Sequence, residues 1–147
     1  MKVSSVAEMR KLDQTGIESY SIPEQILMEN AGGAVYAILR KKTGIRGKSF
    51  LIFCGMGNNG GDGLVVARKI HANGGRVKVY LMGDPDRYTG AAATNFEILS
   101  RLPVEVETLN SVSALSAGLA HCDAVVDALL GTGITRNVGG LYREGVE

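Results

Sequence analysis

The sequence predicts a doubly wound α/β/α sandwich with a mainly parallel sheet, and three observations lead to this fold class. Short apolar segments typical of buried parallel strands alternate with segments whose apolar residues recur at helical spacing. Glycine-rich stretches directly follow two of the apolar segments, as expected where strands of an open sheet end beside a ligand. With 147 residues, 45% of them hydrophobic, the chain is large enough for one domain with its own core.

The composition narrows the classes of function. A charged content of 21% and a net charge of +1 give no reason to expect nucleic acid or an anionic membrane as a partner. No apolar run approaches the ~20 residues of a membrane-spanning helix, and the amino end carries no signal-peptide core. Cys54 and Cys122 lie at strand ends without a pairing pattern, which favours a reducing compartment over a disulfide scaffold. We therefore expect a cytoplasmic protein.

Two helices are expected before the first strand. Residues 5–8 form a capping-box pattern, and the amphipathic helix behind it carries the apolar residues Val6, Met9, Leu12 and Ile17. Pro23 fits the first turn of a second helix, which Gly44 and Gly47 close. The Glu-Asn pair at 29–30 lies among apolar neighbours of this helix. It is either a solvated edge or a polar prop for a site.

Four strands and their connecting helices follow in alternation. The expected strands span residues 49–53, 76–82, 104–109 and 123–130. The third alternates strictly between apolar and polar residues, so it belongs nearer the sheet edge. The expected helices span residues 64–73, 91–102 and 112–120. Residues 141–147 resemble the opening of a crossover helix with no strand after it, so we expect a domain that is truncated at its carboxyl end.

The rules for strand connections predict the strand order third, second, first, fourth. The first and fourth strands are then neighbours at the switch point, where open α/β sheets bind ligands. The glycine-rich residues 55–63 and 131–140 follow these two strands. We therefore expect the two loops to face each other across one crevice.

The first of these loops points to a nucleotide-type ligand. Five glycines within residues 55–63 allow the backbone to take positive φ and to approach a ligand closely. Residues 55–60 match the G-x-G-x-x-G dinucleotide fingerprint. The fingerprint also expects an acidic residue about 20 residues further on, and the nearest candidate, Asp84, comes slightly after that position. Asp62 lies where the helix start would meet a pyrophosphate. A carboxylate there repels phosphate and suits a cation or a ligand hydroxyl, so we interpret the loop as a modified pyrophosphate cradle.

Polar side chains near both loops could hold a cation or a ligand. Asn59 offers an amide carbonyl and Asp127 a carboxylate, and such oxygens suit a hard cation such as K⁺, Na⁺ or Mg²⁺. In the alternative interpretation Asp127 caps the next turn and Asn59 only accepts a positive φ. The second loop offers side chains for phosphate or ribose hydroxyl groups: Thr132, Thr135, Arg136 and Asn137. The arginine among them is equally compatible with a solvated loop residue.

Three motifs together resemble the YjeF N-terminal domain, the NAD(P)H-hydrate (NAD(P)HX) epimerase family. They are Met-Glu-Asn-Ala-Gly at 28–32, the stretch 55–63 with its Asn-Asn-Gly-Gly-Asp core, and Asp-Ala-Leu-Leu-Gly-Thr-Gly at 127–133. The motifs fall in the order found in the family, and the resemblance covers about residues 1–140. It implies a Rossmann-like fold and an isomerase that interconverts the R and S epimers of hydrated nicotinamide cofactors, a metabolite-repair reaction.

The resemblance also implies roles for individual residues. The substrate, NADHX or NADPHX, would be bound by Asn58, Asn59, Gly60, Gly61, Asp62, Gly131, Thr132, Gly133, Ile134, Thr135, Arg136 and Asn137. Asn59 and Asp127 would ligate a K⁺ ion. Asp62 is the only loop carboxylate besides Asp127, which makes it the candidate catalytic acid or base.

The resemblance further indicates what the chain lacks. The family continues into a later strand with a Val-Asp-Ile-Pro-Ser-Gly-like motif, which supplies another site aspartate and a cation-binding serine, and this sequence stops before it. We expect residues 1–147 to be one YjeF N-terminal domain without its C-terminal strands. A dehydratase domain, fused in many relatives, is an expected partner, and an exposed sheet edge would favour a homodimer.

Two other classes of function compete with the epimerase. A non-catalytic nucleotide or ADP-ribose-binding module is favoured by the early end of the chain. A fragment of an NAD-dependent dehydrogenase would bind undamaged NAD and would need an acidic residue on the ribose, and Asp62 counts against it.

Overall fold

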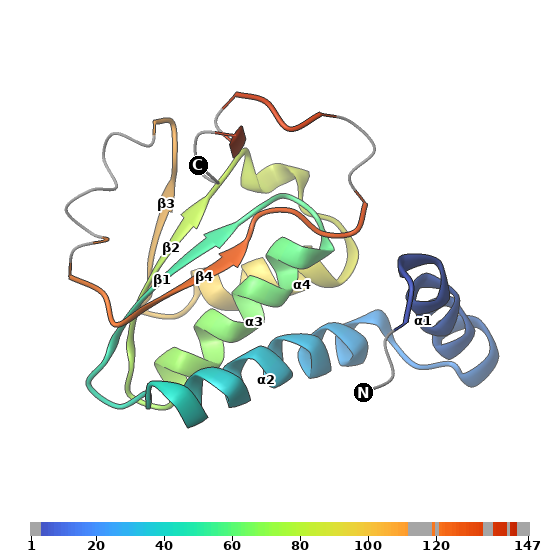
Figure 1. The fold of residues 1–147 in the computed structure, drawn as a ribbon, viewed down its shortest axis with the longest axis horizontal. Helices are drawn as coiled ribbons and strands as arrows, with labels where there is room; N and C mark the ends of the chain where they lie inside the picture. The colour runs from blue at the N-terminus through green and yellow to red at the C-terminus, as the bar shows by residue number, and fades with distance from the viewer. Residues whose placement is uncertain (1–3, 112–118, 120, 134–136, 141, 144–147) are drawn as a thin grey trace.

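The computed structural model describes residues 4–111, 119, 121–133, 137–140 and 142–143. Within these residues four strands form one parallel sheet (Figure 1): β1 (Ser49–Cys54), β2 (Arg76–Leu81), β3 (Glu105–Thr108) and β4 (Ala124–Ala128). Most of the helix expected over 112–120 and most of the opening expected at 141–147 lie outside the described residues. The predicted fold class is confirmed for the part of the chain that the structure covers.

The strand order is β3-β2-β1-β4, as the connection rules predict. β3 is the edge strand expected from its alternating pattern. In the register of the sheet, Cys54 at the end of β1 lies beside Leu81 of β2 and Ala128 of β4. The carboxyl ends of the three strands therefore meet at one edge, with β1 and β4 adjacent at the switch point.

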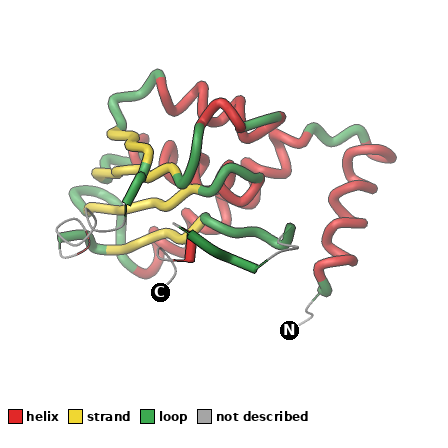
Figure 2. The backbone as a smooth tube through the Cα atoms, turned by 90° about the horizontal axis from the view of Figure 1, so that it is seen from above, coloured by secondary structure: helices red, strands yellow, loops and turns green. Residues whose placement is uncertain are grey.

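Three helices cover one face of the sheet (Figures 1 and 2): α2 (Glu24–Lys42), α3 (Asn58–Ala72) and α4 (Gly90–Ser100). The core beneath them contains Ile52, Leu64 and Ile70, all fully buried. On the opposite face, a smaller cluster includes Phe53 and Tyr80, whose rings stack 5.2 Å apart. A short 3₁₀ turn, η1 (Pro85–Arg87), connects β2 to α4.

The first helix, α1 (Val6–Tyr20), stands apart from the other elements (Figures 1 and 2). Its predicted capping box is confirmed, because the Ser5 hydroxyl accepts from the Glu8 N–H and the Glu8 carboxylate accepts from the Ser5 N–H. No residue of α1 is buried, and its apolar face is open, with Leu12 59% exposed. No helix of the described residues is both long enough and apolar enough to cross a membrane.

The glycine-rich stretch 55–63 differs from its prediction. α3 begins at Asn58 rather than near residue 64, and none of the five glycines has positive φ. Close packing requires four of them, whereas a Cβ on Gly57 would meet nothing within 4 Å. For example, a Cβ on Gly60 would lie 1.7 Å from the Gly55 carbonyl oxygen, and one on Gly63 would lie 2.7 Å from the Ala128 Cβ. The run of glycines therefore lets the first turns of α3 sit against β1 and β4.

Two neighbouring glycines of α2 test whether close packing requires glycine, because alanine is expected to destabilise the fold at one position and to stabilise it at the other. A Cβ at Gly32 would lie 2.6 Å from Val65 and 2.8 Å from the Asp62 carbonyl oxygen, whereas the nearest atom at Gly33 is 3.6 Å away on the flexible Lys69 side chain. Gly32→Ala is expected to lower the free energy of unfolding by about 1–3 kcal/mol through overpacking. Gly33→Ala is expected to raise it by up to about 1 kcal/mol through helix propensity. Urea denaturation of both variants measures the difference, and equal effects would contradict the packing described here.

Candidate functional site

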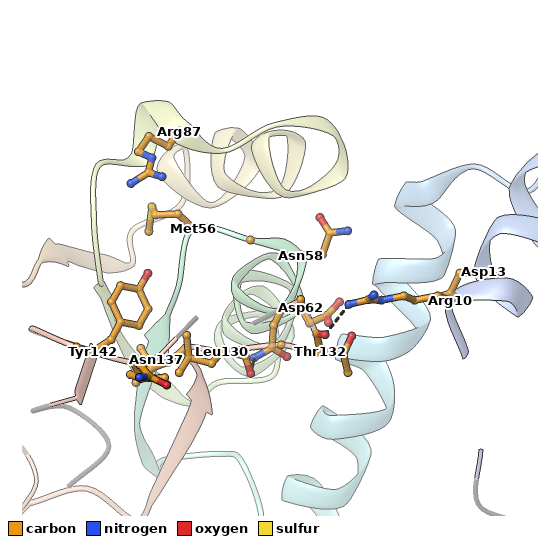
Figure 3. A pocket seen from close by; sticks show the side chains of 17 residues that line it. Arg10, Asp13, Met56, Asn58, Asp62, Arg87, Leu130, Thr132, Asn137 and Tyr142 are labelled. Carbon is orange, nitrogen blue, oxygen red and sulfur yellow. Dashed lines mark hydrogen bonds between the residues drawn. The ribbon is translucent and has the colours of Figure 1, made fainter. Parts of the chain in front are cut away.

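A cavity of about 1000 Å³ lies where the carboxyl ends of β1 and β4 meet the start of α3 (Figure 3). α1 contributes to one of its walls through Arg10 and Asp13. Residues of the predicted binding set that line the cavity are Asn58, Asn59, Asp62, Gly131, Thr132, Gly133 and Asn137. The crevice predicted at the switch point is therefore present, and the cavity has the size of a site for a small organic ligand.

Direct contacts join the two loops that the sequence places across the crevice. The Asn59 side-chain amide donates to the Leu130 carbonyl oxygen at 3.2 Å, and the Gly55 N–H donates to the Ala128 carbonyl oxygen at 3.0 Å. Asn59 lies in the first turn of α3 without a positive φ, so the conformational explanation for this residue is wrong. Its side chain instead holds the second loop against α3.

The remaining members of the predicted binding set are placed differently. Gly60 and Gly61 are buried and do not line the cavity, and Gly61 packs so tightly that a Cβ would lie 2.6 Å from the Met28 side chain. Ile134, Thr135 and Arg136 lie outside the described residues. The first loop thus reaches the cavity through its polar side chains, whereas Gly60 and Gly61 serve packing.

Asp62 is the carboxyl that α3 contributes to the cavity wall. Burial raises the pKa of its carboxyl to about 6, and the nearby Asp13 carboxylate adds to the increase. Its side chain has no hydrogen-bond partner within the described residues, so neither form of the carboxyl is fixed by a neighbour. A group with this pKa exchanges a proton readily near neutral pH.

Sequence reasoning missed the contributions of α1 and of the β2–α4 connection. Arg10 donates from its guanidinium to the Thr132 carbonyl oxygen at 2.5 Å, which ties α1 to the loop after β4 (Figure 3). Asp13, one turn further along α1, faces the same cavity, and Arg87 lines it from η1. The polar face of an amphipathic helix was the only local signal for Arg10 and Asp13, and it does not say which loop the helix approaches.

The predicted cation ligands offer oxygen atoms of the right chemistry. One Asp127 oxygen accepts from the Leu129 N–H at 2.9 Å, so the turn cap foreseen for this residue is present. The second oxygen has no hydrogen bond within the described residues, and Asp127 is not among the residues that line the cavity. Because the Asn59 amide nitrogen is used by Leu130, its carbonyl oxygen also stays available. The described residues contain no group of three or more His, Cys, Asp or Glu side chains that could hold a metal ion. Two hard oxygen donors fit a cation of the alkali type better than a transition metal.

The two residues of the Glu-Asn pair in α2 lie in different surroundings. Glu29 forms ion pairs with Arg68 at 2.5 Å and Lys69 at 2.6 Å, and Arg68 also donates to the buried Asn95 at 2.7 Å. Asn30 is exposed. Glu29 therefore joins α2, α3 and α4 through partners that do not line the cavity, and its role as a prop for the site stays a prediction.

The fold and the cavity define a class of protein, namely a Rossmann-like α/β domain with a ligand-sized cavity where the strand order reverses. The family described as "YjeF-related protein N-terminus" matches residues 24–147. The chain therefore belongs to the YjeF N-terminal family.

Relatives of known name agree with this membership. The bifunctional NAD(P)H-hydrate repair enzyme Nnr of Thermofilum pendens is 43% identical, covering 100% of this chain and 28% of the relative. The NAD(P)H-hydrate epimerase of Anaerococcus prevotii is 34% identical, covering 96% of this chain and 65% of the relative. The crystal structure of yeast ynu0 (YNL200c) superposes with a TM-score of 0.81 at 26% identity, over 99% of this chain and 63% of the yeast chain. The chain thus spans less than two thirds of the length of each.

The raised pKa of Asp62 predicts a pH-dependent stability. The folded state binds this proton more tightly than the unfolded state, so the contribution of Asp62 to the free energy of unfolding falls as pH rises from about 4 to about 6. Asp62→Asn removes this loss, and we expect its Tm to exceed that of the unmodified chain at pH 7.5 but not at pH 4. Asp123→Asn is the matched control, because hydrogen bonding to Lys48 lowers the pKa of Asp123 and its replacement should cost stability at pH 7.5. A Tm gain for Asp62→Asn that is equal at both pH values would contradict the assignment.

Proposed function

We propose that this chain is an NAD(P)H-hydrate epimerase domain that interconverts the R and S forms of NADHX and NADPHX. The observation that carries the proposal is the cavity at the switch point, where residues 56–59 and the half-buried Asp62 of one family motif meet residues 129–133 of another. Curated relatives that share 34–37% identity with most of this chain bear the name NAD(P)H-hydrate epimerase. The domain proposed is the YjeF N-terminal unit within residues 1–147.

In the proposed reaction Asp62 is the catalytic acid and base. Inversion at the hydrated nicotinamide carbon requires its C–O bond to break and to form again on the opposite face. A nearby acid gives a proton to the departing hydroxyl, which leaves as water, and its conjugate base takes a proton back from the water that adds to the other face. A carboxyl whose pKa is about 6 has both forms populated near neutral pH, as this role requires. Polar side chains of the two loops, among them Asn58 and Asn137, would hold the hydrate against it.

A K⁺ ion would be held by Asn59 and Asp127, whose available oxygens support this part of the proposal. When bound, the ion supplies positive charge that helps to orient an anionic dinucleotide. Asn59 acts independently of the ion by fixing the Leu130 carbonyl, and so shapes the cavity wall on the side of β4.

We also propose that the protein is cytoplasmic and that it acts together with a dehydratase and with a second copy of itself. Cys54 and Cys122 are both free thiols, which supports a reducing, cytoplasmic compartment. The names of the bifunctional relatives support cooperation with a second repair activity, which we propose to be a dehydratase that removes the hydrate. Pairing with a second copy of the chain remains a proposal that the oligomeric state in solution would test.

An assay of R-NADHX tests the epimerase proposal and its cation together. We expect the S form to appear, measured by chiral separation or NMR, and to appear faster in K⁺ than in an equal concentration of tetramethylammonium. Conversion that is unaffected by removal of K⁺ would support the epimerase and contradict the ion site. Binding of the hydrate without conversion would favour the ADP-ribose-binding module, and tight binding of undamaged NAD alone would favour the dehydrogenase.

Asp62→Asn tests the assigned catalytic residue. General acid–base catalysis contributes about 10²- to 10⁴-fold, so we expect kcat to fall by at least about 100-fold while the dissociation constant of the hydrate changes little. Asp13→Asn is the companion variant. Because Asp13 raises the pKa of Asp62, its replacement should shift the acidic limb of the pH–rate profile to lower pH without abolishing turnover. Full activity of Asp62→Asn would end the assignment.

A further inference from the structure

A second cavity, of about 580 Å³, adjoins the first at the carboxyl ends of β2 and β3. Its polar lining comes from Asp84 and Arg87, which follow β2, and from Asn110, which follows β3. Arg87 and Tyr142 line both cavities, so the two spaces share a wall. The proposed proton transfer at Asp62 makes no use of this second space.

The residues of the first cavity show which of its sides adjoins the second cavity. Figure 3 shows Arg87 and Tyr142 on the side away from Arg10 and Asp13, with Asp62 between them. Asp62, which would serve the reaction, thus lies inside the first cavity, and the wall shared with the second cavity lies on the side away from α1. A dinucleotide likewise consists of two parts and a connection, because a diphosphate joins its nicotinamide half to its adenosine half. The two cavities and their shared wall match these three parts.

The shared wall carries a cation suited to that diphosphate. Arg87 is exposed and forms no ion pair within the described residues. Its place in η1 is fixed by the backbone bond from its N–H to the Asp84 carbonyl oxygen at 3.1 Å. A guanidinium binds phosphate oxygens through parallel hydrogen bonds and is therefore suited to a diphosphate that crosses from one cavity to the other.

Asp84, inside the second cavity, favours a hydroxyl group over a phosphate, whereas Arg87 favours a phosphate. One of its carboxylate oxygens accepts from the Asp86 N–H at 3.0 Å, which fixes the side chain and leaves the other oxygen without a hydrogen bond in the described part of the chain. A fixed carboxylate at the end of the second strand accepts hydrogen bonds from a ribose hydroxyl. It repels a phosphate at the same position.

We propose that the second cavity binds the adenosine half of the hydrated dinucleotide, an inference that rests on the proposed function. Arg87 binds the diphosphate, and Asp84 accepts a hydrogen bond from the ribose 2′-hydroxyl. NADPHX carries a phosphate in place of that hydroxyl. The chain therefore acts on NADHX in preference to NADPHX, and Asp84 determines this preference.

Steady-state kinetics on R-NADHX and R-NADPHX tests the assignment. The unmodified chain is expected to favour NADHX in kcat/KM by about tenfold or more, and Asp84→Asn, which keeps the oxygen that accepts from Asp86, should bring the ratio close to one. Arg87→Gln should lower kcat/KM for both substrates by similar factors and leave the ratio unchanged. Asp86→Asn makes the same change of charge two residues away on a side chain that lines neither cavity, and it should alter the ratio less than twofold.

Calorimetric binding of ADP-ribose and 2′-phospho-ADP-ribose separates this inference from the epimerase proposal. We expect ADP-ribose to bind more tightly, and Asp84→Asn to remove the difference. Epimerisation with a cofactor ratio and an ADP-ribose preference that are unchanged in Asp84→Asn would overturn the inference and leave the proposed function intact. Discrimination that depends on Asp84, without epimerisation of either hydrate, would uphold the second cavity and overturn the proposed function.

Discussion

The close approach of α3 to the sheet is the constraint on which the rest of this structure depends. Gly60 lies against the Gly55 carbonyl oxygen, and Gly63 lies against Ala128, at distances that exclude any side chain. Because the start of α3 packs so close to β1 and β4, Asn59 reaches the Leu130 carbonyl and Asp62 reaches the cavity at the switch point. The glycines therefore act on function indirectly, by setting where the polar side chains of the same helix stand.

Charge is distributed unequally around that helix. Behind it, Arg68 is satisfied by Glu29 and by the buried Asn95, and no buried side-chain nitrogen or oxygen of the described residues lacks a hydrogen-bond partner. At the cavity, Asp62 faces another carboxylate, Asp13, and burial disfavours its charged form. A paired network thus supports a carboxyl whose charged form is destabilised by its surroundings, as is common for residues that transfer protons.

Rules of topology predicted more of this molecule than local propensity did. Strand order and the meeting of two loops at one crevice follow from connection handedness, and both are confirmed. The start of α3 was misplaced because glycine is a poor helix former, and tertiary packing overrode that propensity from Asn58 onward. Arg10, Asp13 and Arg87 were missed because α1 and η1 approach the site through space, and no sequence spacing encodes that approach. The roles predicted for Asn59 and Asp127 as cation ligands stay predictions.

The fold holds Asp62 as a partly buried carboxyl at a ligand cavity, where a raised pKa suits it to exchange a proton near neutral pH. Titration of the folded chain by carboxyl-detected NMR, with Asp62 assigned by comparison with Asp62→Asn, tests it most directly. We expect the Asp62 resonance to titrate with a pKa of about 6, and this pKa to fall in Asp13→Asn. A titration near the ordinary value of 3.8, unaffected by Asp13, would contradict it.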